Sequence, residues 1–213
     1  MLKWLQELFS KGEQKPIKET LVEKPVDSVE NKEVKNPPWY DVAKKHDGVS
    51  ENNSKFAAIM VPLWNKLFKR DLNSISKYAW CGLGMAAALF WSGQDWQTGG
   101  EMARNWGKYG VAIDWKMQGI PRGAIVWVNH GYDCKSSTSN HVAQADGDCT
   151  SLDLLKSGAR INLYGGNQSN SWKISSFPVK EICAVRWPNN YPIPPKVTKS
   201  VKCYGSSGAG TTR

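Results

Sequence analysis

The chain contains, in the order cysteine, histidine, asparagine, the three residue types that carry out thiol-based acyl transfer. Cys81 follows Trp80 and precedes a run of mostly small residues from 82 to 88. His141 begins an alternating apolar run, and Asn167 follows a strand-like run and the turn expected at Gly165-Gly166. A thiol nucleophile needs an imidazole to take its proton and a third polar group to orient that imidazole. We therefore expect Cys81 to be the nucleophile, His141 the base and Asn167 the orienting group.

The position of Cys81 at the start of an expected helix bears on its reactivity. A helix N-terminus or a neighbouring imidazolium lowers the pKa of a thiol. The backbone N–H of Cys81 is a natural oxyanion donor, and Tyr78 is a weaker candidate for a second one. Asp146 and Asp148 remain alternatives to Asn167 as the third group.

A metal site is a competing interpretation of the same region. Cys134, His141 and Cys149 could together supply ligands, but they lack the close C-x-x-C spacing typical of zinc sites. We therefore expect no metal and no cofactor.

Six short motifs occur in order between about residues 37 and 188. They are Pro38-Trp39-Tyr40-Asp41-Val42-Ala43, Ala79-Trp80-Cys81, Ala103-Arg104-Asn105-Trp106-Gly107, Gly123-Ala124-Ile125-Val126, Asn140-His141-Val142 and Gly165-Gly166-Asn167-Gln168-Ser169-Asn170. Together they resemble the papain-like peptidoglycan hydrolases of the CHAP and NlpC kind, most closely a phage-associated, endolysin-like branch. The resemblance implies a papain-like fold, catalysis by Cys81, His141 and Asn167, and substrate binding by Trp80, Tyr78 and Gln168.

The periodicity changes from helical to alternating along the chain. Helices are expected at residues 39–45, 54–68 with an interruption at Pro62, 81–91 and 99–109, and strands at 124–128, 141–145, 161–164 and 182–186. Helices followed by an antiparallel sheet predict the α+β class, with N-terminal helices packed on a small sheet. We expect three parts: an amphipathic helix and flexible linker (1–36), a hydrolase domain (37–188) and a flexible tail (189–213).

The net charge of +9 and the pI of about 9.3 favour an anionic partner. Nucleic-acid binding would favour a basic stripe interleaved with exposed aromatic residues. The basic residues are scattered instead, which does not favour nucleic acid, and the resemblance implies peptidoglycan as the partner. The apolar stripe in residues 1–10 could contact a phage structural protein or a membrane surface. No run of about 18 apolar residues predicts a transmembrane helix.

Five cysteines are too few to build a disulfide framework in a chain of this length, and an odd number leaves at least one thiol free. Cys134 and Cys149 flank His141 and could form a bridge in an oxidising compartment. Otherwise these cysteines, together with Cys183 in an apolar strand and Cys203 in a polar tail, are expected to be reduced.

These observations predict an enzyme that cuts an amide bond in bacterial peptidoglycan through a thioester. The resemblance implies a phage lysis or virion-borne enzyme, located in the virion or in the host cytoplasm or periplasm. The alternative is a catalytically weak structural or wall-binding virion protein on the same fold. Ala124, which stands where the family usually has an acidic residue, and the glycines Gly82 and Gly84 after the nucleophile favour that alternative.

Overall fold

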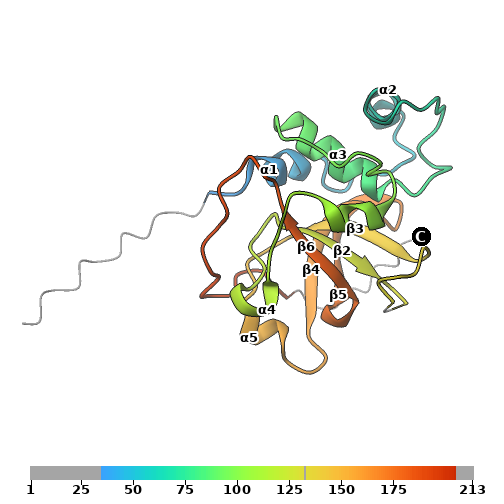
Figure 1. Ribbon diagram of the computed structural model, residues 1–213. Coiled ribbons are helices and arrows are strands. Elements are labelled where there is room, and N and C mark those ends of the chain that lie inside the picture. The colour runs from blue at the N-terminus through green and yellow to red at the C-terminus, as the bar shows by residue number, and fades with distance from the viewer. Residues whose placement is uncertain (1–34, 132, 205–213) are drawn as a thin grey trace, which may run out of the picture. The chain divides into compact units, whose positions relative to one another are not determined.

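The computed structural model describes residues 35–131 and 133–204 and shows an antiparallel sheet covered by helices (Figure 1). The six strands lie in the order β1-β6-β2-β3-β4-β5. Their bounds are β1 Val111–Ala112, β2 Ile125–Asn129, β3 Asn140–Ala145, β4 Arg160–Gln168, β5 Ser171–Pro178 and β6 Ile182–Trp187. The predicted α+β class is confirmed. Predictions for residues 1–34 lie outside the described residues.

Five α-helices and two 3₁₀ turns accompany the sheet in the described residues: α1 Pro38–Lys44, α2 Ser54–Phe68, α3 Cys81–Trp91, α4 Trp115–Gln118, α5 Ser151–Leu154, η1 Ala103–Lys108 and η2 Val179–Glu181. The helix predicted at 81–91 is confirmed as α3. The predicted interruption of α2 is wrong, because the helix continues through Pro62. Proline has no backbone N–H, so the Ala58 carbonyl lacks the hydrogen bond that residue 62 would otherwise donate. Ala58 and Pro62 are both exposed, so water can donate to that carbonyl instead.

The helix predicted at 99–109 is wrong except for the short turn η1. Gly99 adopts a left-handed φ of 67°, and the indole N–H of Trp106 donates to the Gly100 carbonyl at 2.7 Å. Gly99 and Gly100 therefore form a turn that the hydrogen bond from the Trp106 side chain stabilises, and no helix extends through them.

The turn predicted at Gly165-Gly166 is also wrong, because β4 continues through both glycines to Gln168. The chain reverses at Ser169 and Asn170, which adopt left-handed φ values of 50° and 60°. The glycines serve a close approach instead. A Cβ on Gly166 would lie 2.6 Å from Cε3 of the Trp80 indole. Strand β5, which follows the reversal, was not predicted because its serines and lysine obscure the alternation.

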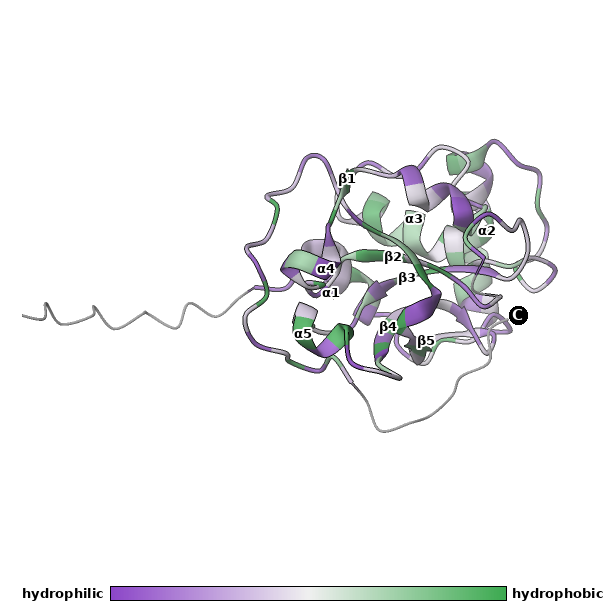
Figure 2. Cartoon of the chain, turned by 60° about the horizontal axis from the view of Figure 1, so that its bottom comes forward, coloured by the Kyte–Doolittle hydropathy of each residue, from purple (hydrophilic) through white to green (hydrophobic). Residues whose placement is uncertain are grey.

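Helix α3 is the central element of the core. All its residues from Cys81 to Leu89 are buried, and it packs on β3 and β4. Figure 2 shows that α3 and β2 carry mainly hydrophobic residues. Gly84 allows this packing, because it faces the Cα of Gly166 in β4. Gly82 allows the segment before η1 to approach the helix, because a Cβ there would overlap the Gly100 carbonyl. The glycines of the nucleophile helix are therefore explained by close packing.

Two disulfides, Cys134–Cys183 and Cys149–Cys203, join segments that are distant in sequence. The prediction of reduced cysteines is wrong, and so is the suggested Cys134–Cys149 bridge. These two residues flank β3, whose six residues span about 20 Å at roughly 3.3 Å per residue, so their sulfurs lie near opposite ends of the strand.

The predicted flexible tail is wrong for residues 189–204. The Cys149–Cys203 disulfide anchors this segment, and Val201 forms an isolated β-bridge with Asp148. The Val197 N–H also donates to the Gln118 carbonyl at 2.9 Å. Composition alone suggested flexibility, but contacts with the loops around β3 and α4 hold the segment against the domain. Residues 205–213 lie outside the described range.

Within the described residues, no helix combines the length and the apolar character needed to cross a membrane.

Candidate active site

The candidate nucleophile Cys81 is the first residue of α3, and its side chain points toward the beginning of β3. Backbone amides of Val142, Gly82 and Cys81 itself approach its sulfur. The side chain is 3% exposed. All five cysteines lie in the described part of the chain, and Cys81 alone is free. The helix and the sheet therefore present one thiol beside the residue that follows His141.

The candidate base His141 is the second residue of β3 and is buried. Its ring stacks on Phe177, with ring centroids 5.4 Å apart and an interplanar angle of 13°. His130 also stacks on Phe177, at 5.7 Å, and its Nδ1 lies 3.1 Å from Oε2 of the buried Glu181. Phe177 thus packs against both imidazoles and restricts the orientation of His141. His130 is accordingly half-buried and held between Phe177 and Glu181.

Asn167 lies near the end of β4, the strand that neighbours β3 in the sheet. Strands β3 and β4 pair Gln144 with Tyr164 and Ala145 with Leu163, and His141 and Asn167 each lie three residues beyond the first of these pairs. Asn167 has a left-handed φ of 60° at an irregularity in β4, a kind of distortion that re-aims side chains near active sites.

No hydrogen bond joins His141 and Asn167 in this structure. Both amide atoms of Asn167 and Nε2 of His141 are buried without a hydrogen-bond partner among the described residues. A buried polar atom without a hydrogen bond lowers the stability of the fold. The side chains of His141 and Asn167 lie on neighbouring strands, and each has such an unpaired atom in the described part of the chain. Catalytic hydrogen bonds are often long in the absence of substrate.

Burial determines the protonation of the candidate pair. It raises the pKa of the Cys81 thiol, and the amides of Val142, Gly82 and Cys81 offset part of that rise. Burial, and secondarily the charge of His130, lowers the pKa of His141 to about 3. In the resting state the thiol and the imidazole are therefore both neutral, and burial makes the imidazole a weaker base than a solvent-exposed one.

A groove of about 470 Å³ reaches Cys81. It runs between the segment before η1 and the β2–β3 loop, and we call it the catalytic groove. Its lining comprises Ala79, Cys81, Glu101, Met102, Ala103, Arg104, Ser137, Ser139 and Asn140. Sequence reasoning missed the lining residues other than Cys81, since isolated polar residues in loops carry no periodic signal.

The predicted substrate-binding residues lie elsewhere. Trp80 and Gln168 are fully buried. The Trp80 indole N–H donates to Glu51 at 2.9 Å, and the Gln168 amide donates to the Leu163 carbonyl at 3.2 Å. Tyr78 is exposed but packs edge-on against the ring of Trp64 and does not line the catalytic groove. These three assignments are corrected: the first two are structural, and the third lies outside the groove.

Glu51 is a site-supporting residue that the sequence did not reveal. Its carboxylate accepts the Trp80 N–H, and its backbone N–H donates to the Asn170 carbonyl at 2.9 Å. It therefore links the residue before Cys81 to the turn that follows Asn167. No local pattern marks a buried glutamate whose partners are distant in sequence.

The alternative third groups are engaged elsewhere. Asp146 accepts the Tyr40 hydroxyl at 2.7 Å and lies five positions beyond His141, about 16 Å along an extended strand. Asp148 accepts the Arg122 backbone N–H at 2.9 Å.

The alternative metal site is not supported. Its two cysteines belong to separate disulfides, and no group of metal-ligating side chains occurs among residues 35–131 and 133–204.

Comparison of the chain with protein-family models, with curated proteins and with solved structures returned no match. The function of this protein is therefore inferred from the chemistry of the site and from the motif resemblance.

Proposed function

We propose that this protein is a papain-like cysteine hydrolase that cuts an amide bond in bacterial peptidoglycan. One observation carries the proposal: the single free thiol lies at a helix N-terminus, beside the strand that bears His141, and at a groove open to a substrate. Helix-bound thiols next to a base are the recurring arrangement of acyl-transfer enzymes. The order of the motifs supports the same class.

In the proposed reaction, His141 takes the proton of Cys81 as the sulfur attacks the amide carbonyl carbon. The Cys81 backbone N–H stabilises the oxyanion that forms on the carbonyl oxygen. His141 then returns the proton to the leaving amine, and a thioester remains on Cys81. Water, deprotonated by His141, hydrolyses the thioester to release a carboxylic acid and restore the thiol. Asn167 orients His141 by a hydrogen bond that closes when substrate fills the catalytic groove.

The location of this activity is an oxidising compartment. Two disulfides are typical of extracytoplasmic proteins and of virion surfaces, because cytosolic thiols are kept reduced. The net charge of +9 suits an anionic wall polymer. We place the enzyme in a phage virion or in the host periplasm, acting on the wall, with the phage context taken from the motif resemblance alone.

The second candidate is a wall-binding virion protein with little catalytic power. The raised pKa of Cys81 and the unbonded amide of Asn167 favour it. In this candidate the groove binds peptidoglycan strands and the thiol remains protonated.

Zymography on purified peptidoglycan separates the two candidates. The wild type should clear the substrate, and Cys81→Ala should not, with circular dichroism unchanged. Mass spectrometry of the released fragments then identifies the amide that is cut. If the wild type binds peptidoglycan without clearing it, or if Cys81→Ala keeps a tenth of the activity, the hydrolase proposal fails.

A further inference from the structure

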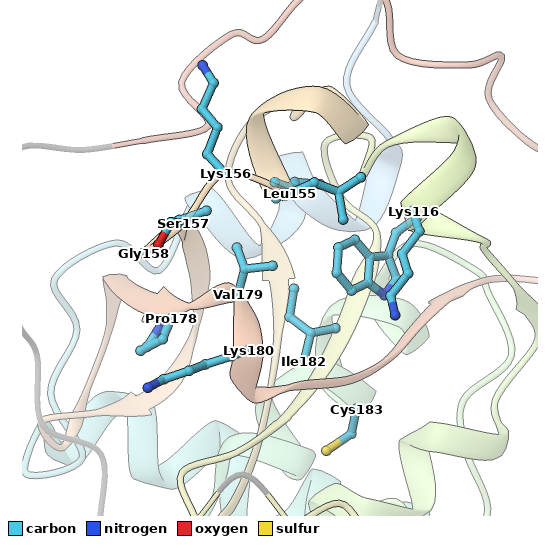
Figure 3. Close-up of a pocket in the computed structure, with 13 residues that line it drawn as sticks. Lys116, Leu155, Lys156, Ser157, Gly158, Pro178, Val179, Lys180, Ile182 and Cys183 are labelled. Carbon is cyan, nitrogen blue, oxygen red and sulfur yellow. The ribbon is translucent and has the colours of Figure 1, made fainter.

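A second groove lies between α4, α5 and the β5–β6 turn, and no residue of the proposed reaction lines it. Its volume is about 720 Å³, within the size range of small-ligand sites. We call it the basic groove (Figure 3). It is lined by Trp115, Lys116, Leu154, Leu155, Lys156, Ser157, Gly158, Ala159, Pro178, Val179, Lys180, Ile182 and Cys183.

The inner surface of the basic groove is apolar. Leu154 and Val179 are buried, and Trp115 and Ile182 are half-buried. An accessible indole beside aliphatic side chains offers a flat apolar surface. Such a surface suits the C–H face of a sugar ring better than a free ion.

The rim of the basic groove is cationic. Lys116, Lys156 and Lys180 are exposed lining residues, and the lining contains no aspartate or glutamate. The ammonium of Lys156 pairs with Asp153 at 2.6 Å, and that of Lys116 lies 5.6 Å from the ring centroid of Trp115. Figure 3 shows Lys116 and Lys180 on opposite sides of the groove, with Val179 and Ile182 between them. This charge distribution selects an anionic occupant.

The basic groove and the catalytic groove are joined by one covalent link. Cys183 lines the basic groove and is bonded to Cys134 in the β2–β3 loop. The same loop supplies Ser137 and Ser139 to the wall of the catalytic groove. A single disulfide-bonded loop therefore connects the walls of the two grooves.

We infer that the basic groove is an accessory site for an anionic glycan, holding a second stretch of the wall polymer by stacking a sugar on Trp115 and pairing carboxylates with Lys116 and Lys180. The identity of the polymer rests on the proposed function, whereas the ligand class rests on the groove. Single-stranded nucleic acid binds by stacking successive bases on several aromatic side chains. The basic groove is lined by one aromatic residue, Trp115, so it suits a glycan better than single-stranded nucleic acid.

The test measures binding in the absence of hydrolysis. Full-length Cys81→Ala protein is titrated into fluorescently labelled, soluble peptidoglycan strands, and anisotropy gives Kd. Replacing Lys116 and Lys180 together by alanine should weaken binding roughly tenfold, the effect of losing two surface ion pairs. The matched control replaces Lys55 and Lys77, which are exposed outside both grooves, and should change Kd less than twofold.

Two further probes test the chemistry. Strands whose carboxyl groups are amidated should bind wild-type and groove variants equally. Trp115→Ala should weaken binding of strands but not of poly-glutamate. Equal loss in the Lys55 and Lys77 control, no loss in the groove variant, or preferential binding of single-stranded DNA through Lys116 and Lys180 would each overturn the inference.

The inference and the proposed function fail separately. Hydrolysis by the wild type with binding indifferent to the basic groove removes only the accessory site. Groove-dependent binding without any hydrolysis by the wild type supports the accessory site and removes the enzyme.

Discussion

Replacing Gly166 by alanine should damage both stability and activity, because the new methyl group has no space. Its Cβ would lie 2.6 Å from Cε3 of Trp80, whereas carbon atoms in contact stay at about 3.5–4.0 Å. The separation must therefore grow by about 1 Å. Trp80 cannot give way easily, because its N–H is bonded to Glu51 and its ring packs against Phe56 and Trp172.

The displacement is therefore expected to reach the backbone at Cys81 or Asn167. Overpacking of this kind costs about 1–3 kcal/mol, which for a domain of this size lowers the unfolding midpoint by roughly 2–12 °C. A shift of about 1 Å in a reacting group can reduce the rate roughly 100-fold. Thermal unfolding and the initial rate of peptidoglycan clearing measure the two effects.

Gly84→Ala is the matched control, since Gly84 lies at the contact between α3 and β4 that also contains Gly166. There a Cβ would meet Gly166 and Trp172 at 3.4 Å, an ordinary contact, and alanine favours the helix by about 0.5–1 kcal/mol. This variant should be at least as stable as the wild type and remain active. A Gly166→Ala protein with wild-type midpoint and rate would refute the packing argument, as would equal damage from both variants.

Further changes test the remaining assignments. In the clearing assay, His141→Gln should cost as much activity as Cys81→Ala because the pair acts as a unit, and Asn167→Ala should cost less; loss restricted to an Asp146 variant would reassign the third role. The pKa of about 3 for buried His141 lies below its unfolded value, so its contribution to stability is complete above about pH 6.5 and is lost as pH falls toward 3. His141→Gln should flatten that part of the pH profile of the unfolding midpoint, and an unchanged slope would contradict the burial of a neutral imidazole. Thiol titration of the denatured, unreduced protein should find one free thiol among the five cysteines, and five would exclude both disulfides. Glu51→Ala should lower stability and clearing rate by leaving the Trp80 N–H unpaired, whereas Glu51→Gln should retain most of both, since its amide oxygen still accepts; equal loss in both variants would show that the charge matters.

The sequence by itself determined the class of the fold and the position of its central helix. Apolar and small residues from 81 to 91 specify a buried helix whatever surrounds it, and the alternating runs near 125, 141 and 182 specify strands. These are local signals, since they depend on the period of side chains along one element. The same periodicity placed Cys81 at a helix start and His141 on a strand.

The tertiary structure decided what depends on contacts between distant segments. Gly165 and Gly166 suggest a turn locally, but they lie within β4, where Gly165 faces Ala143 of β3 and Gly166 faces the Trp80 ring, and neither position has space for a side chain. The disulfide partners follow from which loops meet at each end of β3, and Cys203 thereby anchors a segment whose composition suggests a tail. Trp80 and Gln168 became structural because the packing of α3 on β4 leaves them no access to solvent. Spacing along the chain specifies secondary structure, but burial, pairing and groove walls arise only when separate elements close on one another.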